Sequence, residues 1–154
     1  MTTSEKTEFE LKFDTYAKIA KPVSEVFEAV VDPKKLSGYF TTGGAKGRLE
    51  TGATVTWDFH DFPGAFPVYV KKVLPNQLIE LEWQAGDGDY NTRVRMEFES
   101  LGPDKSLVRI SESGWRSTPK ALESAFGNCR GWSQMVLALK VYLEQGINLR
   151  SFLY

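Results

Sequence analysis

Few residues in this chain could do acid–base or nucleophilic chemistry. Its 154 residues include one histidine, His60, and one cysteine, Cys129. A zinc site needs more cysteine and histidine ligands than these. Nucleophilic catalysis of the Ser-His-Asp or Cys-His type would have to use His60. His60 shares the polar parity of a predicted strand with Asp58, which favours a surface loop. This scarcity favours binding over catalysis.

Glu112 is the residue best placed for chemistry. It shares strand parity with Val108 and Ile110, which puts its carboxyl group on an apolar face. Burying an unpaired carboxylate costs several kcal/mol and raises its pKa. Glu112 could therefore anchor a polar group of a ligand, or act as a general acid or base with His60 as a second candidate. Alternatively, the strand frays at Ser111 and leaves Glu112 solvated.

Two loops have compositions that invite a metal or phosphate interpretation. Asp87–Asn91 begins like a calcium loop, but Thr92 and Phe98 stand where the loop needs glycine and glutamate. Gly43–Gly47 is rich in glycine but lacks the spacing of a phosphate-binding loop. We therefore predict a hairpin turn and a plain loop, with no metal and no cofactor. Cys129 lies on an apolar helix stripe and should pack as a small hydrophobe.

Charge and hydropathy exclude several classes of partner. Lys and Arg number 19 against 20 Asp and Glu, which gives a net charge of −1. No basic stripe exists that could follow a phosphate backbone, so nucleic acid is not expected. No apolar run approaches the length of a membrane span, and residues 1–6 do not form a signal peptide. We expect a cytoplasmic protein whose residues 1–7 are disordered or frayed.

The N-terminal part of the sequence predicts one strand followed by two short helices. Apolar and charged residues alternate from Phe9 to Ile19, as in a half-buried strand. Pro22 then opens a short helix that Asp32 ends, and a second short helix or turn is expected over 33–40. The glycine-rich stretch 41–47 reads as a loop.

The middle of the chain, 48–113, predicts antiparallel strands joined as hairpins. Alternating residues and turn signals recur at regular spacing. Their facings predict a register, which cross-strand ion pairs would support. The expected pairs are Glu82 with Arg93, Glu80 with Arg95, and Glu97 with Arg109.

A long C-terminal helix should cover the apolar face of this sheet. Thr118 is its expected N-cap, and the helix should run from Pro119 to about Gln145 with Gly146 as its stop. Its apolar stripe contains Leu122, Phe126, Cys129, Trp132, Val136, Leu139 and Leu143. The predicted fold is α+β, in one domain spanning 1–154.

This order of elements, together with several motifs, resembles the START-like (SRPBCC) superfamily. The closer resemblance is to the family of the activator of the heat-shock ATPase chaperone. The stretches that carry it are Ile19–Pro22 with Val26-Phe27 and Asp32-Pro33, Gly64–Trp83 with Leu74-Pro75, Ser113–Trp115, Gly131-Trp132 with Leu139, and Tyr142–Glu144. The resemblance implies a helix-grip fold, in which a curved antiparallel sheet wraps around a long helix and an apolar cavity lies between the two.

The resemblance also implies a function, because superfamily members bind lipids, polyketides and other apolar molecules, and a few are enzymes. We expect an apolar or amphipathic small molecule between the sheet and the final helix. The expected contacts are Trp57, Phe59, Trp83, Met96, Glu112, Trp132 and Val136. A close-packed core would account for the same aromatic residues. Two alternatives are a cyclase or hydrolase using Glu112, and a regulator that contacts a chaperone, as a monomer or homodimer.

Overall fold

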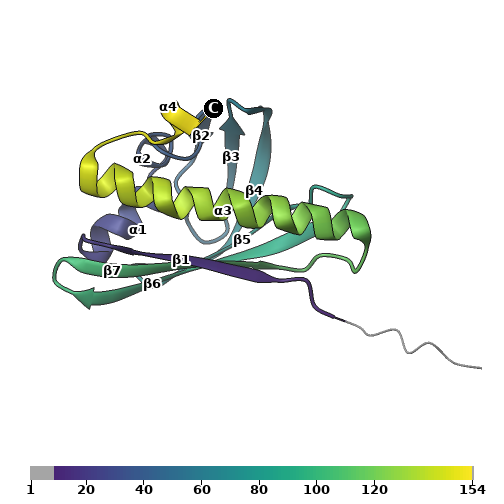
Figure 1. The fold of residues 1–154 in the computed structure, drawn as a ribbon, viewed down its shortest axis with the longest axis horizontal. Helices are drawn as coiled ribbons and strands as arrows, with labels where there is room; N and C mark the ends of the chain where they lie inside the picture. Colours follow the sequence, from purple (N-terminus) through teal and green to yellow (C-terminus); the bar gives the residue numbers. More distant parts are fainter. Residues whose placement is uncertain (1–8, 154) are drawn as a thin grey trace, which may run out of the picture.

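A computed structural model describes residues 9–153. It contains a seven-stranded sheet, one long helix and three short helices (Figure 1). The predicted fraying of residues 1–7 lies outside the described residues. The elements are β1 (Phe13–Ile19), α1 (Val23–Val31), α2 (Pro33–Leu36), β2 (Gly44–Lys46), β3 (Thr54–Phe59), β4 (Phe62–Leu74), β5 (Leu78–Gln84), β6 (Asn91–Gly102), β7 (Lys105–Ser113), α3 (Pro119–Gln145) and α4 (Arg150–Leu153). The predicted α+β class is confirmed.

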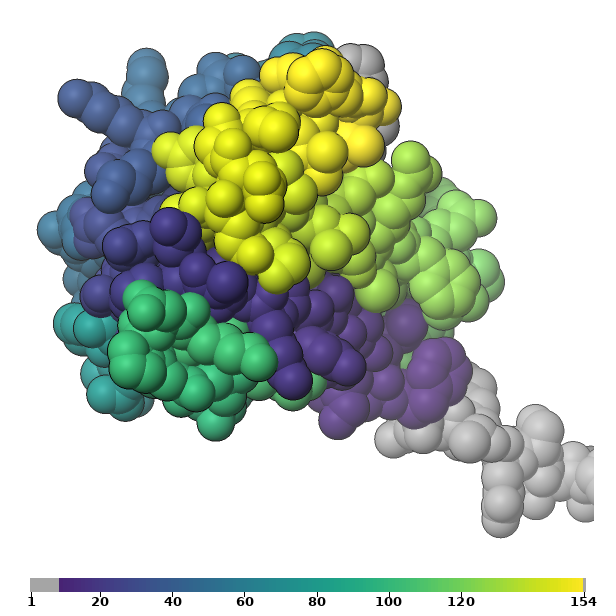
Figure 2. Space-filling model, turned by 60° about the vertical axis from the view of Figure 1, so that its left-hand side comes forward, coloured from purple at the N-terminus to yellow at the C-terminus, as the bar shows by residue number. Residues whose placement is uncertain are grey.

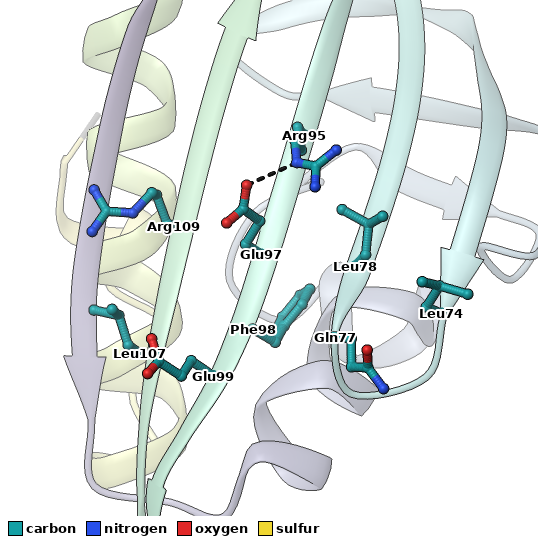
Figure 3. A pocket seen from close by; sticks show the side chains of 9 residues that line it. All are labelled: Leu74, Gln77, Leu78, Arg95, Glu97, Phe98, Glu99, Leu107 and Arg109. Atoms are coloured by element: carbon teal, nitrogen blue, oxygen red, sulfur yellow. Dashed lines mark hydrogen bonds and ion pairs between the residues drawn. The ribbon is translucent and has the colours of Figure 1, made fainter.

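The sheet is antiparallel throughout, in the order β1-β7-β6-β5-β4-β3-β2. The predicted register is confirmed: Glu82 lies opposite Arg93, Glu80 opposite Arg95, and Glu97 opposite Arg109. Of the three expected ion pairs the structure shows Glu80 with Arg95, whereas Glu82 pairs with Lys71 and Arg109 with Asp14. Arg95, Glu97 and Arg109 lie on the outer face of the sheet (Figure 3).

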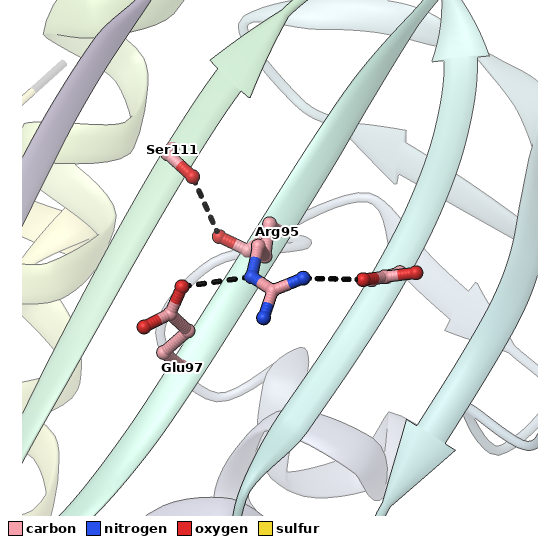
Figure 4. Close-up of polar contacts among 4 residues, drawn as sticks. Arg95, Glu97 and Ser111 are labelled. Carbon is pink, nitrogen blue, oxygen red and sulfur yellow. Dashed lines mark hydrogen bonds and ion pairs between the residues drawn. The ribbon is translucent and has the colours of Figure 1, made fainter.

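Arg95 is the centre of the charged network on this outer face. Its guanidinium donates to Glu97 Oε1 at 2.8 Å and to Glu80 Oε1 at 2.6 Å, while the Ser111 hydroxyl donates to the Arg95 carbonyl at 3.5 Å (Figure 4). The side chains of these ion pairs are at least one-third exposed. Exposed pairs stabilise a fold by at most about 1 kcal/mol each. Their main effect is to keep this face in water, which leaves the opposite face to be covered.

Helix α3 covers that opposite face (Figure 1). Its predicted bounds are confirmed: Thr118 Oγ1 accepts from the Ala121 amide at 3.1 Å, and Gly146 ends the helix in the left-handed region at φ 68°. Glycine suits that position because it has no Cβ to clash. In its second half, α3 buries the side chains of Trp132, Met135, Val136, Ala138 and Leu139.

The prediction was wrong for the first two turns of α3. Leu122 and Phe126 were placed on the buried stripe, but their exposed fractions are 38% and 67%. Ala121 and Ala125 face inward there instead, where they pack with Trp115 in a second small core. The bulky Trp115 ring leaves room only for small side chains, so the larger apolar residues turn outward.

Three other element bounds also differ from expectation. Gly44–Lys46 forms a strand paired with β3, although 41–47 was expected to be a loop. The second helix ends at Leu36 instead of continuing toward residue 40. The first strand begins at Phe13 and not at Phe9, because Phe13 pairs with Glu112 and the partner strand β7 ends one residue later, at Ser113. Within the described residues, no helix is both long and apolar enough to cross a membrane.

Candidate functional site

Glu112 lies inside the protein, under α3. Glu112 is only 1% exposed. Its strand is paired on both sides, and Glu112 lies opposite Phe13 of β1 and Val94 of β6. The alternative of a frayed strand with a solvated Glu112 is therefore wrong, because β7 continues through Ser113. Strand parity predicted the facing of this residue correctly.

The Glu112 carboxyl group receives hydrogen bonds from both layers of the fold. From the sheet, Trp83 Nε1 donates at 2.9 Å and Thr92 Oγ1 at 2.6 Å. From α3, Trp132 Nε1 donates at 2.8 Å and Asn128 Nδ2 at 3.1 Å to each carboxyl oxygen. The carboxyl group thus joins the helix to strands β5 and β6. Its oxygens accept five hydrogen bonds in all.

Burial dominates the acid–base behaviour of Glu112. Desolvation raises the pKa of its carboxyl group above the ordinary value of 4.5. The hydrogen bonds from Thr92, Trp83, Trp132 and Asn128 lower the pKa, because they favour the charged form, but they offset the desolvation only in part. No ion pair found in residues 9–153 includes Glu112.

A dependence of stability on pH follows. The folded protein holds the Glu112 proton more tightly than the unfolded chain does. Glu112 therefore adds to the free energy of unfolding as the pH falls from above the raised pKa toward 4.5, and this gain is lost as the pH rises through the raised pKa. Urea unfolding of the wild type and of Glu112→Gln at several pH values isolates the effect, because the other carboxyl groups are common to both. We expect the stability of the wild type relative to the variant to increase toward low pH; a decrease would contradict the assignment.

Two of the rings that contact this carboxyl group, Trp83 and Trp132, belong to one connected cluster of six aromatic rings. Trp132 lies at its centre, 5.2 Å from Trp83, 5.4 Å from Phe40 and 6.5 Å from Trp57 between ring centroids. Phe59 and Phe66 extend the cluster, 5.9 Å apart, with Phe66 5.8 Å from Trp83. We call this set the aromatic cluster: Phe40, Trp57, Phe59, Phe66, Trp83 and Trp132.

The structure brings the predicted site residues together. Trp57, Phe59, Trp83 and Trp132 are all in the aromatic cluster, and Met96 and Val136 are buried in the core that adjoins it. Four residues of the site were not among the predicted contacts: Phe40, Phe66, Thr92 and Asn128. Phe66 shares parity with Val68, which could have identified it. Thr92 shares parity with Met96, and Asn128 precedes Trp132 by one helical turn, so both partners of Glu112 were also visible in the spacing.

The aromatic cluster reaches the surface at one end. Trp57, Trp132 and Phe40 are buried, whereas Phe59, Phe66 and Trp83 are partly exposed. The C-terminal segment, yellow in Figure 2, lies against its own chain. Its Arg150 guanidinium lies 5.9 Å from the Phe59 ring and pairs with Asp61 at 2.6 Å.

His60 does not join Glu112. It is exposed, as predicted, and its backbone and ring both contact the Thr42 hydroxyl, with the ring Nδ1 at 2.5 Å. A polar hollow of about 280 Å³ contains it, lined by Ser37, Thr42, His60, Asn148, Arg150 and Ser151. Within residues 9–153, His60 and Glu112 share no hydrogen-bond partner, so the structure does not support the two as a catalytic pair.

The model of the family described as "Activator of Hsp90 ATPase homolog 1-like protein" matches residues 20–144. The chain belongs to this family. The match covers the whole aromatic cluster and Glu112, and it ends before α4. Among curated proteins, no significant match was found.

Solved structures show the same fold. The protein SSP2350 from Staphylococcus saprophyticus is 28% identical with a TM-score of 0.76, over 90% of this chain and 96% of that one. The Aha1 dimer from Colwellia psychrerythraea is 22% identical with a TM-score of 0.71, over 88% and 97%. A START superfamily protein from Mycobacterium smegmatis is 17% identical with a TM-score of 0.63, over 88% and 99%. The predicted START-like helix-grip fold is confirmed.

Proposed function

We propose that this protein binds a hydrophobic or amphipathic small molecule between the sheet and α3. The observation that carries the proposal is the aromatic cluster, which runs without a break from the partly exposed Phe59 and Phe66 to the buried Trp57 and Trp132. Pockets for small molecules are mostly apolar and aromatic, with a few polar groups that fix orientation. The cluster has this composition.

Glu112 supports the proposal as the group that orients two of the rings. Its carboxyl oxygens accept from the indoles of Trp83 and Trp132, which come from opposite layers. A buried charge is costly, and a close-packed core could be built more stably from apolar side chains. Holding two indoles in fixed positions gives this cost a purpose, because rigid walls reduce the entropy lost on binding.

Binding requires an outer ring to move. Trp57, Met96 and Trp132 are each no more than 1% exposed, so the inner part of the cluster is closed by its own side chains. The ring proposed to rotate outward is the partly exposed Phe59, which stacks on Phe66 at 22°. A ligand would take the place of Phe59, stack on Phe66 and reach the inner indoles.

The neutral probe N-phenyl-1-naphthylamine tests the proposal. We expect saturable binding of one probe per chain, with energy transfer from tryptophan to the probe. Phe66→Ala should weaken binding at least about fivefold, because it removes one wall of the site. Phe126→Ala is the matched control, since that ring is 67% exposed on α3, away from the cluster, and the affinity should be unchanged. A folded wild type that binds no probe, or an equal loss in both variants, would sink the proposal.

Catalysis by Glu112 has weaker support than binding. A general acid or base must present an oxygen to the substrate. The five hydrogen bonds from protein donors occupy the lone pairs of both Glu112 oxygens. His60 lies outside the cluster and shares no partner with Glu112. The arrangement therefore suits a structural anchor.

A second candidate function is regulation of an Hsp90-type ATPase, which the family match favours. The relative from Colwellia psychrerythraea is a dimer, and a homodimer is the form we propose for this role. The direct test is the ATP hydrolysis rate of Hsp90 with and without the purified chain. Stimulation that survives Phe66→Ala would separate this role from small-molecule binding.

A further inference from the structure

The indole of Trp57 is the one polar group of the aromatic cluster without a partner. Trp57 is 1% exposed, and its Nε1 has no hydrogen-bond acceptor among the described residues. The other two indoles of the cluster, Trp83 and Trp132, both donate to Glu112. Buried indole N–H groups are nearly always paired, because an unpaired buried donor has lost its hydrogen bond to water. The exception therefore needs an explanation.

Glu112 does not serve as the acceptor for Trp57 Nε1. That carboxyl group already accepts five hydrogen bonds, from Trp83, Thr92, Asn128 and Trp132. Trp57 nevertheless lies among the same rings, 5.9 Å from Trp83 and 6.5 Å from Trp132. An unused donor thus sits inside the site proposed for the ligand, next to two donors that the protein itself has satisfied.

We infer that the ligand is a flat conjugated molecule that carries a neutral acceptor oxygen, such as a ketone or an ether, and that this oxygen accepts a hydrogen bond from Trp57 Nε1. The inference rests on the proposed function and specifies its ligand. Flatness follows from the pairs of rings that lie within about 35° of parallel: Phe40 with Trp132 at 29°, Phe59 with Phe66 at 22°, and Trp83 with Trp132 at 34°. A flat molecule can replace one ring of such a pair and keep the stacking.

The same contacts exclude a cationic head group as the main polar feature. A buried carboxylate inside an aromatic box would suit an ammonium ion if its oxygens were available. Here those oxygens are occupied by donors from the protein. The group left to satisfy is a donor, Trp57 Nε1, and its complement is an acceptor.

A matched pair of probes tests this inference. In 2-acetylnaphthalene a ketone oxygen replaces the terminal CH₂ of 2-isopropenylnaphthalene, and the two molecules have nearly the same shape. Both are titrated as competitors of N-phenyl-1-naphthylamine. We expect the ketone to bind the wild type about fivefold more tightly, the size of effect given by one net hydrogen bond. In Trp57→Phe the preference should fall to about unity, whereas in Trp83→Phe, the control, the preference should persist.

The outcomes separate the two proposals. If N-phenyl-1-naphthylamine binds but the wild type does not prefer the ketone, or if the preference survives in Trp57→Phe, the acceptor inference is wrong while small-molecule binding stands. If no probe binds the folded wild type, both proposals are wrong. A second measurement avoids reliance on a variant that might not fold: the Trp57 indole proton in the ¹⁵N–¹H spectrum of the wild type should move downfield with the ketone and not with the alkene. Equal shifts would overturn the inference.

Discussion

Replacing Glu112 with Leu should lower the free energy of unfolding by about 3–5 kcal/mol, although it removes a buried charge. Leucine is close in size to glutamate and suits a strand, so the backbone should be kept. The loss arises because the buried Thr92 hydroxyl and Trp132 indole would be left without an acceptor. The partly buried Trp83 indole and Asn128 amide would lose theirs as well. Each such donor costs about 1–3 kcal/mol. Urea unfolding followed by far-UV circular dichroism measures the difference.

Two further variants test whether the cost comes from these donors. Glu112→Gln keeps one acceptor oxygen but turns an NH₂ group toward one indole, so we expect an intermediate loss of about 1–3 kcal/mol. Glu97→Gln removes a carboxylate from the outer face, where the ion pair with Arg95 is about half exposed, and should cost less than about 1 kcal/mol. A Leu variant as stable as the wild type would show that Glu112 does not hold α3 to the sheet.

The fold could be predicted well from the sequence because its signals are local and consistent. Thr118, Pro119 and Gly146 mark the ends of α3 through capping chemistry that needs no tertiary information. The register between β5 and β6 follows from charges of opposite sign at alternate positions, as in Glu82 with Arg93. The predicted element bounds are wrong where a segment distant in the sequence determines whether a strand forms. Residues 9–12 alternate like a strand but have no strand beside them, because β7 ends at Ser113.

The candidate site could be predicted only in part, for a similar reason. Parity alone places Glu112 and Trp57 on the inner face, and this was correct. Whether a buried polar group is satisfied depends on the atoms that meet it from other elements. Asn128 and Trp132 come from α3, a separate element that begins at Pro119, after the strand of Glu112 has ended at Ser113. No spacing rule in the sequence states that their side chains converge on one carboxyl group. The lack of a partner at Trp57 is likewise visible only in three dimensions.

Replacing Trp132 with Ala should also destabilise the fold strongly, by about 3–5 kcal/mol, as expected for a large ring deleted from a packed core. The ring contacts Phe40, Trp57 and Trp83 and its indole donates to Glu112. Trp132→Phe keeps much of the stacking and loses the donor, so it should cost less, about 1–3 kcal/mol. Phe126→Ala on the same helix is the control and should change stability by less than about 0.5 kcal/mol, because its ring is 67% exposed.

A double-mutant cycle between Glu112→Leu and Trp132→Phe then measures the link between the helix and the sheet directly. In the Leu background the Trp132 indole has lost its acceptor, so its removal also removes a cost. Trp132→Phe should therefore be less harmful there than in the wild type, with a coupling of about 1–2 kcal/mol. Unfolding in urea of the four proteins gives this value. Additive losses would mean that the 2.8 Å contact between Trp132 Nε1 and Glu112 contributes nothing to stability, and that apolar packing alone holds α3 in place.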